Sequence, residues 1–154
     1  MRKFEILTLL VLIFICSCSG NKDSASYWFD KAMALWNGSK YTDPEKAIEY
    51  YGKAIDLQKN NAELYNNRGT AYYNLEQYVL AIDDFNKAIL LKKDFIDAYN
   101  NRGSVYFMTG QYDSAIDDFN KAISLKKDYA DAYNNRGIAY ITQGKKKLGI
   151  ADLR

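Results

Sequence analysis

The chain has no histidine, and its two cysteines, Cys16 and Cys18, both lie within the first twenty residues. Histidine is the commonest general base near neutral pH and the commonest nitrogen ligand for transition metals, so its absence removes much enzyme chemistry. Beyond residue 18 there is no thiol for a disulfide, a zinc site or a cysteine nucleophile. The stability of this part must come from side-chain packing, and no catalytic residue, metal site or cofactor is predicted.

The charge balance gives no sign of a nucleic-acid partner. Lysines and arginines number 21 and aspartates and glutamates 19, which leaves a formal charge of only +2. A nucleic-acid binder usually needs a strong positive field to attract the phosphate backbone. With 48% hydrophobic and 26% charged residues among 154, the chain is expected to fold as one domain.

The first residues have the order of a secretory signal. Arg2 and Lys3 precede an apolar run over residues 6–16, and small residues follow over 17–20. The 11 residues of this run would rise about 16 Å as a helix, whereas a bilayer core of about 30 Å needs roughly 20 residues. A cleaved signal therefore fits this segment better than a permanent transmembrane helix.

The sequence around Cys18 resembles the lipobox of bacterial lipoproteins. The branched apolar Ile15 stands three positions before Cys18, and the small Ser17 stands directly before it. Cys16 fits poorly, because Ile15 would then occupy the position of the small residue. The resemblance implies removal of residues 1–17, lipid attachment at Cys18, and a membrane-anchored lipoprotein of the bacterial cell envelope on its periplasmic or surface side. An ordinary cleaved signal and an uncleaved anchor remain alternatives.

Beyond a polar tether over residues 18–24, the chain repeats itself every 34 residues. The tetrapeptide Asn-Asn-Arg-Gly begins at residues 66, 100 and 134, and residues 62–95 match residues 96–129 at 21 of 34 positions. A period of this length is typical of arrays of helical hairpins, in which each unit buries its apolar face against the next.

The residues within each unit resemble the tetratricopeptide repeat. The pattern reads Tyr65, Gly69, Tyr72, Ala81, Phe85 and Ala88 in one unit and starts again at Tyr99 and at Tyr133. The resemblance implies an all-α, right-handed superhelical solenoid of antiparallel helix pairs. We expect units over residues 25–61, 62–95, 96–129 and 130–154, which is about three and a half repeats because the last is partial.

The first unit departs from the pattern by three extra residues near residues 42–44. Pro44, the single proline, stands where the second helix of this unit should begin. Proline is tolerated at the first helical position, and Thr42 or Asp43 is suited to cap that start.

Small residues at fixed positions are expected to set the distance between helices. A larger side chain at a tight crossing would push the partner helix away. The predicted packing positions are Gly69, Gly103, Gly137, Ala81, Ala115, Ala88 and Ala122. Capping boxes are predicted at three helix starts, at Asn60-x2-Glu63, Asp94-x2-Asp97 and Asp128-x2-Asp131.

Arginines recur one helix ahead of paired acids. Arg68 precedes the pair at residues 83–84, Arg102 precedes the pair at residues 117–118, and Arg136 recurs at the same position of the last unit. Paired acids can serve metal or acid–base chemistry, but ion pairs between helices are the favoured interpretation, and exposed ones contribute about 0 to 1 kcal/mol.

By resemblance, the first helix of each unit lines a concave groove. Asparagines there lie beside aromatic and apolar side chains, which suits an extended peptide because asparagine both donates to and accepts from a peptide backbone. The predicted lining is Phe29, Met33, Trp36, Asn66, Thr70, Tyr73, Asn74, Asn100, Ser104, Phe107, Met108, Asn134, Ile138 and Ile141. Alternatively, the asparagines serve the repeat's own hydrogen bonds. A clamp for a terminal carboxylate is not predicted, because Phe29, Asp97 and Asn101 hold the positions of its cations.

We therefore expect a protein-interaction scaffold or adaptor with a protein or peptide partner. An enzyme is a rival, but no nucleophile, base or metal constellation stands outside the repeat pattern. An RNA-reading pentatricopeptide array is a second rival, and its 35-residue period and basic surface are missing. The last unit leaves Ile138, Tyr140 and Ile150 uncovered. Three explanations for these residues remain open: a homodimer through this end, a partner protein that covers it, or a longer parent chain. The homodimer would suit an enzyme accessory or assembly factor.

The lipoprotein interpretation predicts the mass of the mature chain. Because the lipobox pattern centres on Cys18, the purified protein should begin at Cys18 and carry the added mass of its acyl groups. Intact-mass spectrometry measures both properties, and a mature chain without added lipid mass at Cys18 would contradict the interpretation.

Overall fold

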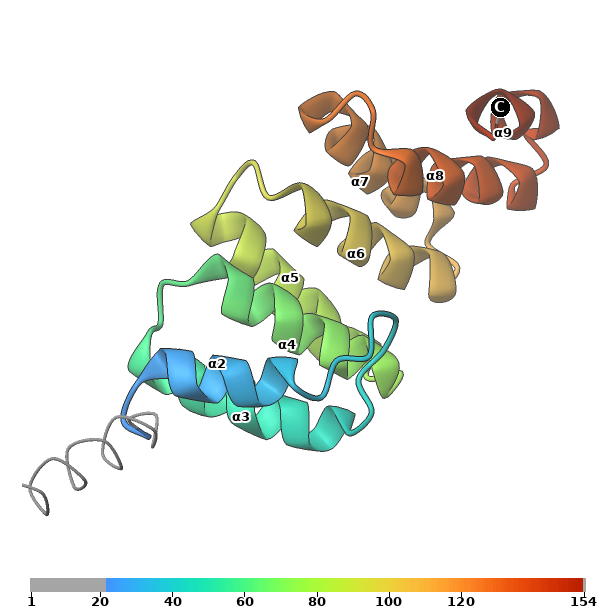
Figure 1. The fold of residues 1–154 in the computed structure, drawn as a ribbon. Helices are drawn as coiled ribbons and strands as arrows, with labels where there is room; N and C mark the ends of the chain where they lie inside the picture. The colour runs from blue at the N-terminus through green and yellow to red at the C-terminus, as the bar shows by residue number, and fades with distance from the viewer. Residues whose placement is uncertain (1–21, 154) are drawn as a thin grey trace, which may run out of the picture.

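A computed structural model describes residues 22–153, so the signal segment and Cys18 lie outside the described residues. The chain is all-α there: a right-handed superhelical solenoid of about three and a half repeats, as predicted. The helices are α2 (Ala25–Met33), α3 (Pro44–Leu57), α4 (Ala62–Asn74), α5 (Tyr78–Leu91), α6 (Ile96–Met108), α7 (Tyr112–Leu125), α8 (Ala130–Thr142) and α9 (Lys146–Asp152). Figure 1 shows these pairs side by side, from α2 and α3 at one end to α8 and α9 at the other. None of these helices is long and apolar enough to cross a bilayer.

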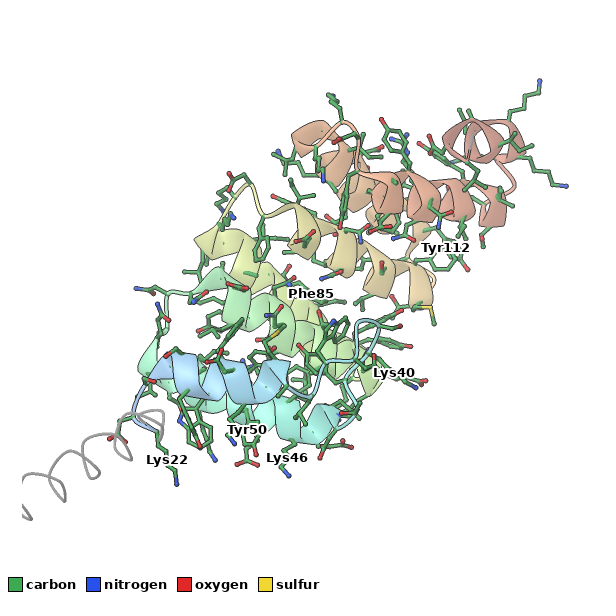
Figure 2. The ribbon with its side chains drawn as sticks, viewed as in Figure 1. Lys22, Lys40, Lys46, Tyr50, Phe85 and Tyr112 are labelled. Atoms are coloured by element: carbon green, nitrogen blue, oxygen red, sulfur yellow. The ribbon has the colours of Figure 1, made fainter. Side chains whose placement is uncertain are left out.

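The two helices of each of the last three units meet at a glycine. A Cβ atom on Gly137 would lie 2.9 Å from Cγ of Leu153, the residue that follows α9. A Cβ atom on Gly69 would lie 2.8 Å from Cε1 of Phe85, and one on Gly103 would lie 2.7 Å from Cε1 of Phe119. These distances are shorter than any real Cβ contact, so the aromatic ring occupies the space that a side chain would need. Figure 2 labels Phe85, whose ring fills this space between α4 and α5.

The core is a row of small clusters along the stack. Alanines at the predicted packing positions are fully buried. Each junction between units has its own cluster, such as Ala122 and Ile123 of α7 against Ala132 of α8. At the first unit, Tyr51 and Leu64 are the largest fully buried side chains. Stability therefore accumulates unit by unit through contacts between neighbours.

A charged pair joins the helices of each of the last three units. Nε and Nη2 of Arg102 donate to the two carboxylate oxygens of Asp118 at 2.8 and 2.7 Å. The hydrogen bond to Asp118 raises the pKa of Arg102. Burial raises the pKa of the Asp118 carboxyl, and the hydrogen bond from Arg102 opposes this shift. The guanidinium also lies over the rings of Tyr99 and Tyr106, 5.6 and 5.8 Å from their centroids.

The same pair recurs at a constant offset along the chain. Arg68 binds Asp84 and Arg136 binds Asp152, each through two hydrogen bonds of 2.6 to 2.8 Å. Sequence reasoning identified the arginines and the first two acids as structural, which the structure confirms, but it did not find Asp152. Among residues 22–153, no group of acids is arranged to hold a metal ion.

The extra residues of the first unit form a short turned connection over residues 34–43 between α2 and α3. Trp36 and Tyr41 pair as an isolated antiparallel bridge, and Oδ1 of Asn37 accepts from the backbone amides of the two residues before Tyr41. Asp43 caps α3 by accepting from the amide of Lys46 at 3.0 Å. The predicted role of Pro44 at the first helical position is confirmed.

The predicted capping boxes are wrong. The cap of α4 is Asn61, whose side chain accepts from the amide of Glu63 at 3.0 Å. Phe95 and Tyr129 hold the cap positions of α6 and α8, and neither helix has a side-chain cap. Both rings lie against the clusters at the junctions between units. Asn61, Phe95 and Tyr129 share one repeat position and keep non-helical backbone angles, so each of the three helices begins one residue later than expected.

Removing one partner of a charged pair should lower the free energy of unfolding. Asp118→Ala leaves the guanidinium of Arg102, whose side chain is 19% exposed, without its carboxylate. We expect a loss of about 3 kcal/mol, the lower end for a broken buried pair because part of the guanidinium reaches water. Urea unfolding followed by circular dichroism measures this change.

The matched control is Asp117→Ala, which removes the neighbouring exposed carboxylate from the same helix. It should change the free energy of unfolding by no more than about 0.5 kcal/mol. Equal losses for the two variants would show that the ion pair does not stabilise the unit.

Candidate protein-interaction groove

The first helices of the units lie on the inner side of the stack. α4 contacts α6, and α6 contacts α8, in addition to the contacts within and between units. Side chains bridge the same helices: the Tyr129 hydroxyl at the start of α8 donates to Oδ1 of Asp97 on α6 at 2.9 Å. We call the surface formed by α2, α4, α6 and α8 the groove.

Asparagines form a ladder along the groove. Nδ2 of Asn101 donates to Oδ1 of Asn66, and Nδ2 of Asn135 donates to Oδ1 of Asn100, each at 3.1 Å. Asn66 and Asn100 are only 7% and 8% exposed. Within α4, Asn66 also donates to Oδ1 of Asn67. The Oδ1 atoms of Asn66 and Asn100 therefore serve the repeat's own hydrogen bonds, which was the alternative to peptide binding in the sequence analysis. They join consecutive units and do not face a ligand.

Two cavities open on the groove. The larger, which we call the polar cavity, has a volume of about 360 Å³ and is lined by Met33, Trp36, Tyr41, Asn66, Asn67, Thr70, Asp97, Asn100, Asn101, Tyr129 and Asp131. The smaller, the apolar cavity, has a volume of about 120 Å³ and is lined by Tyr73, Ser104, Phe107, Met108, Phe119, Asn135 and Ile138. The two cavities lie next to each other because both draw on α4, α6 and α8.

The polar cavity has an aromatic wall that comes from the connection of the first unit. The backbone amide of Tyr41 donates to Oδ1 of Asn74 at 2.9 Å, which fixes the connection against the end of α4. The rings of Trp36 and Tyr41 meet edge to face with their centroids 5.0 Å apart. The Tyr41 and Tyr51 hydroxyls share a buried hydrogen bond of 2.8 Å. Burial raises the pKa of both phenols, so they remain neutral.

The apolar cavity presents uncovered side chains. Met108 is 53% exposed and Ile138 is 41% exposed. The ring of Phe107 packs 5.5 Å from that of Tyr112, the first residue of α7, and so is held in place by the second helix of its unit. Exposed apolar groups beside a fixed ring provide a surface that a partner side chain can cover.

Most of the predicted groove residues line one of the two cavities, and four do not. Phe29 packs edge to face on Tyr51 with the centroids 6.1 Å apart. Asn74 is engaged by the amide of Tyr41. Asn134 is exposed on α8, and Ile141 lies against Gly149 of α9.

Sequence reasoning missed several lining residues. They are Tyr41, Asn67, Phe119, Tyr129, Asn135 and Asp131, together with Asp97 and Asn101, which the sequence placed in the groove only as the positions of the absent clamp cations. The asparagines and aspartates could have been found, because they recur at the repeat period on the first helices. Tyr41 could not, because only the folded connection brings it to α4.

Family comparisons match this architecture. A family model described as "TPR repeat" matches residues 43–76 and 105–144, and one described as "Tetratricopeptide repeat" matches residues 62–95. A comparison with curated protein sequences found no match.

Solved structures share the fold. A crystal structure of MamA is 28% identical with a TM-score of 0.77, over 86% of this chain and 75% of that one. The Arabidopsis OM64 TPR domain is 28% identical with a TM-score of 0.73, over 80% of this chain and 99% of that one. The second TPR domain of human RPAP3, solved in complex with an HSP70 peptide, is 27% identical with a TM-score of 0.69, over 75% of this chain and 93% of that one.

The family models together match more than half of the chain, and the helix pairs, the glycine crossings and the repeat period agree with them. The chain belongs to the tetratricopeptide repeat family.

Proposed function

We propose that this chain is a protein-interaction scaffold or adaptor at the bacterial cell envelope, which holds a segment of a partner protein in the groove. The observation that carries the proposal is the pair of adjoining cavities on one face of α4, α6 and α8. One cavity offers amide and hydroxyl groups for a peptide backbone, and the other offers uncovered apolar surface for a side chain.

The rigidity of the groove supports a binding role. Its walls are fixed by the asparagine ladder, by the Tyr41 amide on Asn74 and by the Tyr129 hydroxyl on Asp97. A partner segment would therefore meet a preformed surface, so little ordering of this chain opposes binding. The likeness to a peptide-bound RPAP3 domain is consistent with this use of the fold.

Anchoring in the envelope is a separate part of the proposal, and it rests on the residues around Cys18. A lipid at this position followed by a short tether would keep the groove close to the membrane. The scaffold would then recruit or hold its partner at that surface.

Crosslinking from the groove tests the binding role. A photo-crosslinking amino acid placed at Met108 in intact cells should join the chain to a partner, because this side chain is 53% exposed in the apolar cavity. The same residue placed at Val79, which is 74% exposed on the second helix α5, is the matched control and should give no such product.

Carboxylates in the apolar cavity should remove the product. For this test the chain carries the crosslinker at Ser104. We expect Met108→Asp with Ile138→Asp to lower the yield of the crosslinked product at least about tenfold, since a charge cannot be buried under an apolar partner. Val79→Asp with Leu90→Asp should leave it unchanged. Equal yields from Met108 and Val79 would contradict a groove-bound partner, and a product of two copies of the chain would instead favour self-association.

Serine substitutions at the two cysteines test the anchor. Cys18→Ser should move the chain from the membrane fraction to the soluble fraction of the envelope, because lipid attachment needs the thiol. Cys16→Ser is the matched control and should leave the chain in the membrane fraction. Identical fractionation of the two variants would argue against the lipid anchor at Cys18.

A further inference from the structure

The arginines of α4, α6 and α8 point away from the groove. Each of these helices contains one basic residue, at Arg68, Arg102 and Arg136. Each arginine is held by two hydrogen bonds to an aspartate on the second helix of its unit. Within residues 22–153 no lysine lies on α4, α6 or α8. The linings of the two cavities accordingly contain no lysine or arginine.

The aspartates of α6 and α8 line the groove. Asp97 and Asp131 occupy the same position in consecutive units, and both line the polar cavity. Each is exposed, and neither forms an ion pair with any lysine or arginine of the described chain. One oxygen of Asp97 accepts from the hydroxyl of Tyr129, which brings no positive charge to the carboxylate.

The chain thus separates its charges although its formal net charge is only +2. The polar cavity is an acidic recess between walls of protein, and a concave surface lined by one sign of charge concentrates the field within it. The remaining lining combines amide and hydroxyl groups, which suit an extended backbone, with the side chains of Met33 and Trp36. A segment with acidic side chains would be repelled there, and so would the phosphates of a nucleic acid.

We propose that the polar cavity selects an extended segment of a partner protein that carries two basic side chains, which pair with Asp97 and Asp131. This inference rests on the proposed function of the groove. Neighbouring helices lie about 8 to 10 Å apart, and an extended chain rises about 3.3 Å per residue, so the basic residues should stand two or three positions apart. The apolar cavity beside it would take an apolar residue of the same segment.

Selection from a random peptide library tests the inference. Displayed peptides of about ten residues would be enriched on the full chain held in detergent, and the most enriched peptides would then be synthesised. We expect them to carry two lysines or arginines two or three positions apart. Asp97→Asn with Asp131→Asn should weaken their binding about fivefold to thirtyfold in fluorescence anisotropy, since asparagine keeps the shape and the acceptor but loses the charge.

The matched control is Asp83→Asn with Asp117→Asn, the same charge change one period apart on the second helices, where both carboxylates are exposed. The affinity of this control variant for the peptides should stay within about twofold of that of the unchanged chain. Raising the salt from about 50 to 300 mM should weaken binding to the unchanged chain more than binding to the Asp97 and Asp131 variant, because screening acts only on the lost pairs.

The possible failures separate the two proposals. Suppose that the enriched peptides bind the Met108→Asp, Ile138→Asp variant more weakly, but are neutral or acidic, or bind the Asp97 and Asp131 variant as well as the unchanged chain. The preference for basic segments would then be wrong, and the groove would remain the binding surface. If no enriched peptide responds to substitutions in either cavity, the groove does not bind peptides and both proposals fall.

Discussion

The close crossing of two helices at a glycine, in each of the last three units, is the constraint on which the rest of the structure depends. Because the ring of Phe119 fills the place of a side chain at Gly103, α6 and α7 can approach only in one relative position. The same crossing at Gly69 repeats this geometry one unit earlier. Identical pairs stacked with a constant step produce a superhelix with a narrow inner side, and this narrow side is the groove.

Two polar networks convert this stack into a rigid surface. The arginine and aspartate pairs join the helices within a unit, and Nη1 of Arg102 also donates to Asn86 of the preceding unit. The asparagine ladder joins the inner helices of consecutive units, as between Asn101 and Asn66. Buried polar groups are costly unless every one is paired. In the described part of the chain, no buried side-chain nitrogen or oxygen lacks a hydrogen-bond partner.

The fold was predicted from the resemblance to the tetratricopeptide repeat, and the repeat period and the small residues that carry this resemblance can be identified from their spacing. The starts of α4, α6 and α8 were misjudged by one residue, because Asn61, Phe95 and Tyr129 keep non-helical backbone angles and the helices begin only after them. Asp152 was within reach of the sequence, since it follows Arg136 at the same offset as Asp118 follows Arg102.

The groove was harder to predict than the fold. The position of the groove followed from the resemblance. Which of its side chains face a ligand, and which bond to other parts of the chain, did not. Asn66 and Asn100 have the chemistry of ligands for a peptide, yet their oxygens are taken by the next unit, and only the folded stack shows this. Tyr41 enters through a turn that belongs to one unit alone. Spacing identifies residues that recur in every unit, whereas this part of the groove depends on a connection that is present only in the first unit.

Differences between two nearly identical units indicate how the groove distinguishes one direction from the other. Residues 62–95 and 96–129 agree at 21 of 34 positions, and the agreement includes the crossing glycines, the buried alanines and the charged pairs. Their inner helices differ at Asn74 against Met108, and only Met108 lines a cavity. The polar cavity draws on the earlier residues of α4, α6 and α8, and the apolar cavity draws on later residues of the same helices. Along these helices the inner surface therefore changes from amides and carboxylates to thioether, ring and aliphatic groups. A segment that is basic at one end and apolar at the other would fit this change in one orientation and oppose it in the reverse, so the groove has a direction.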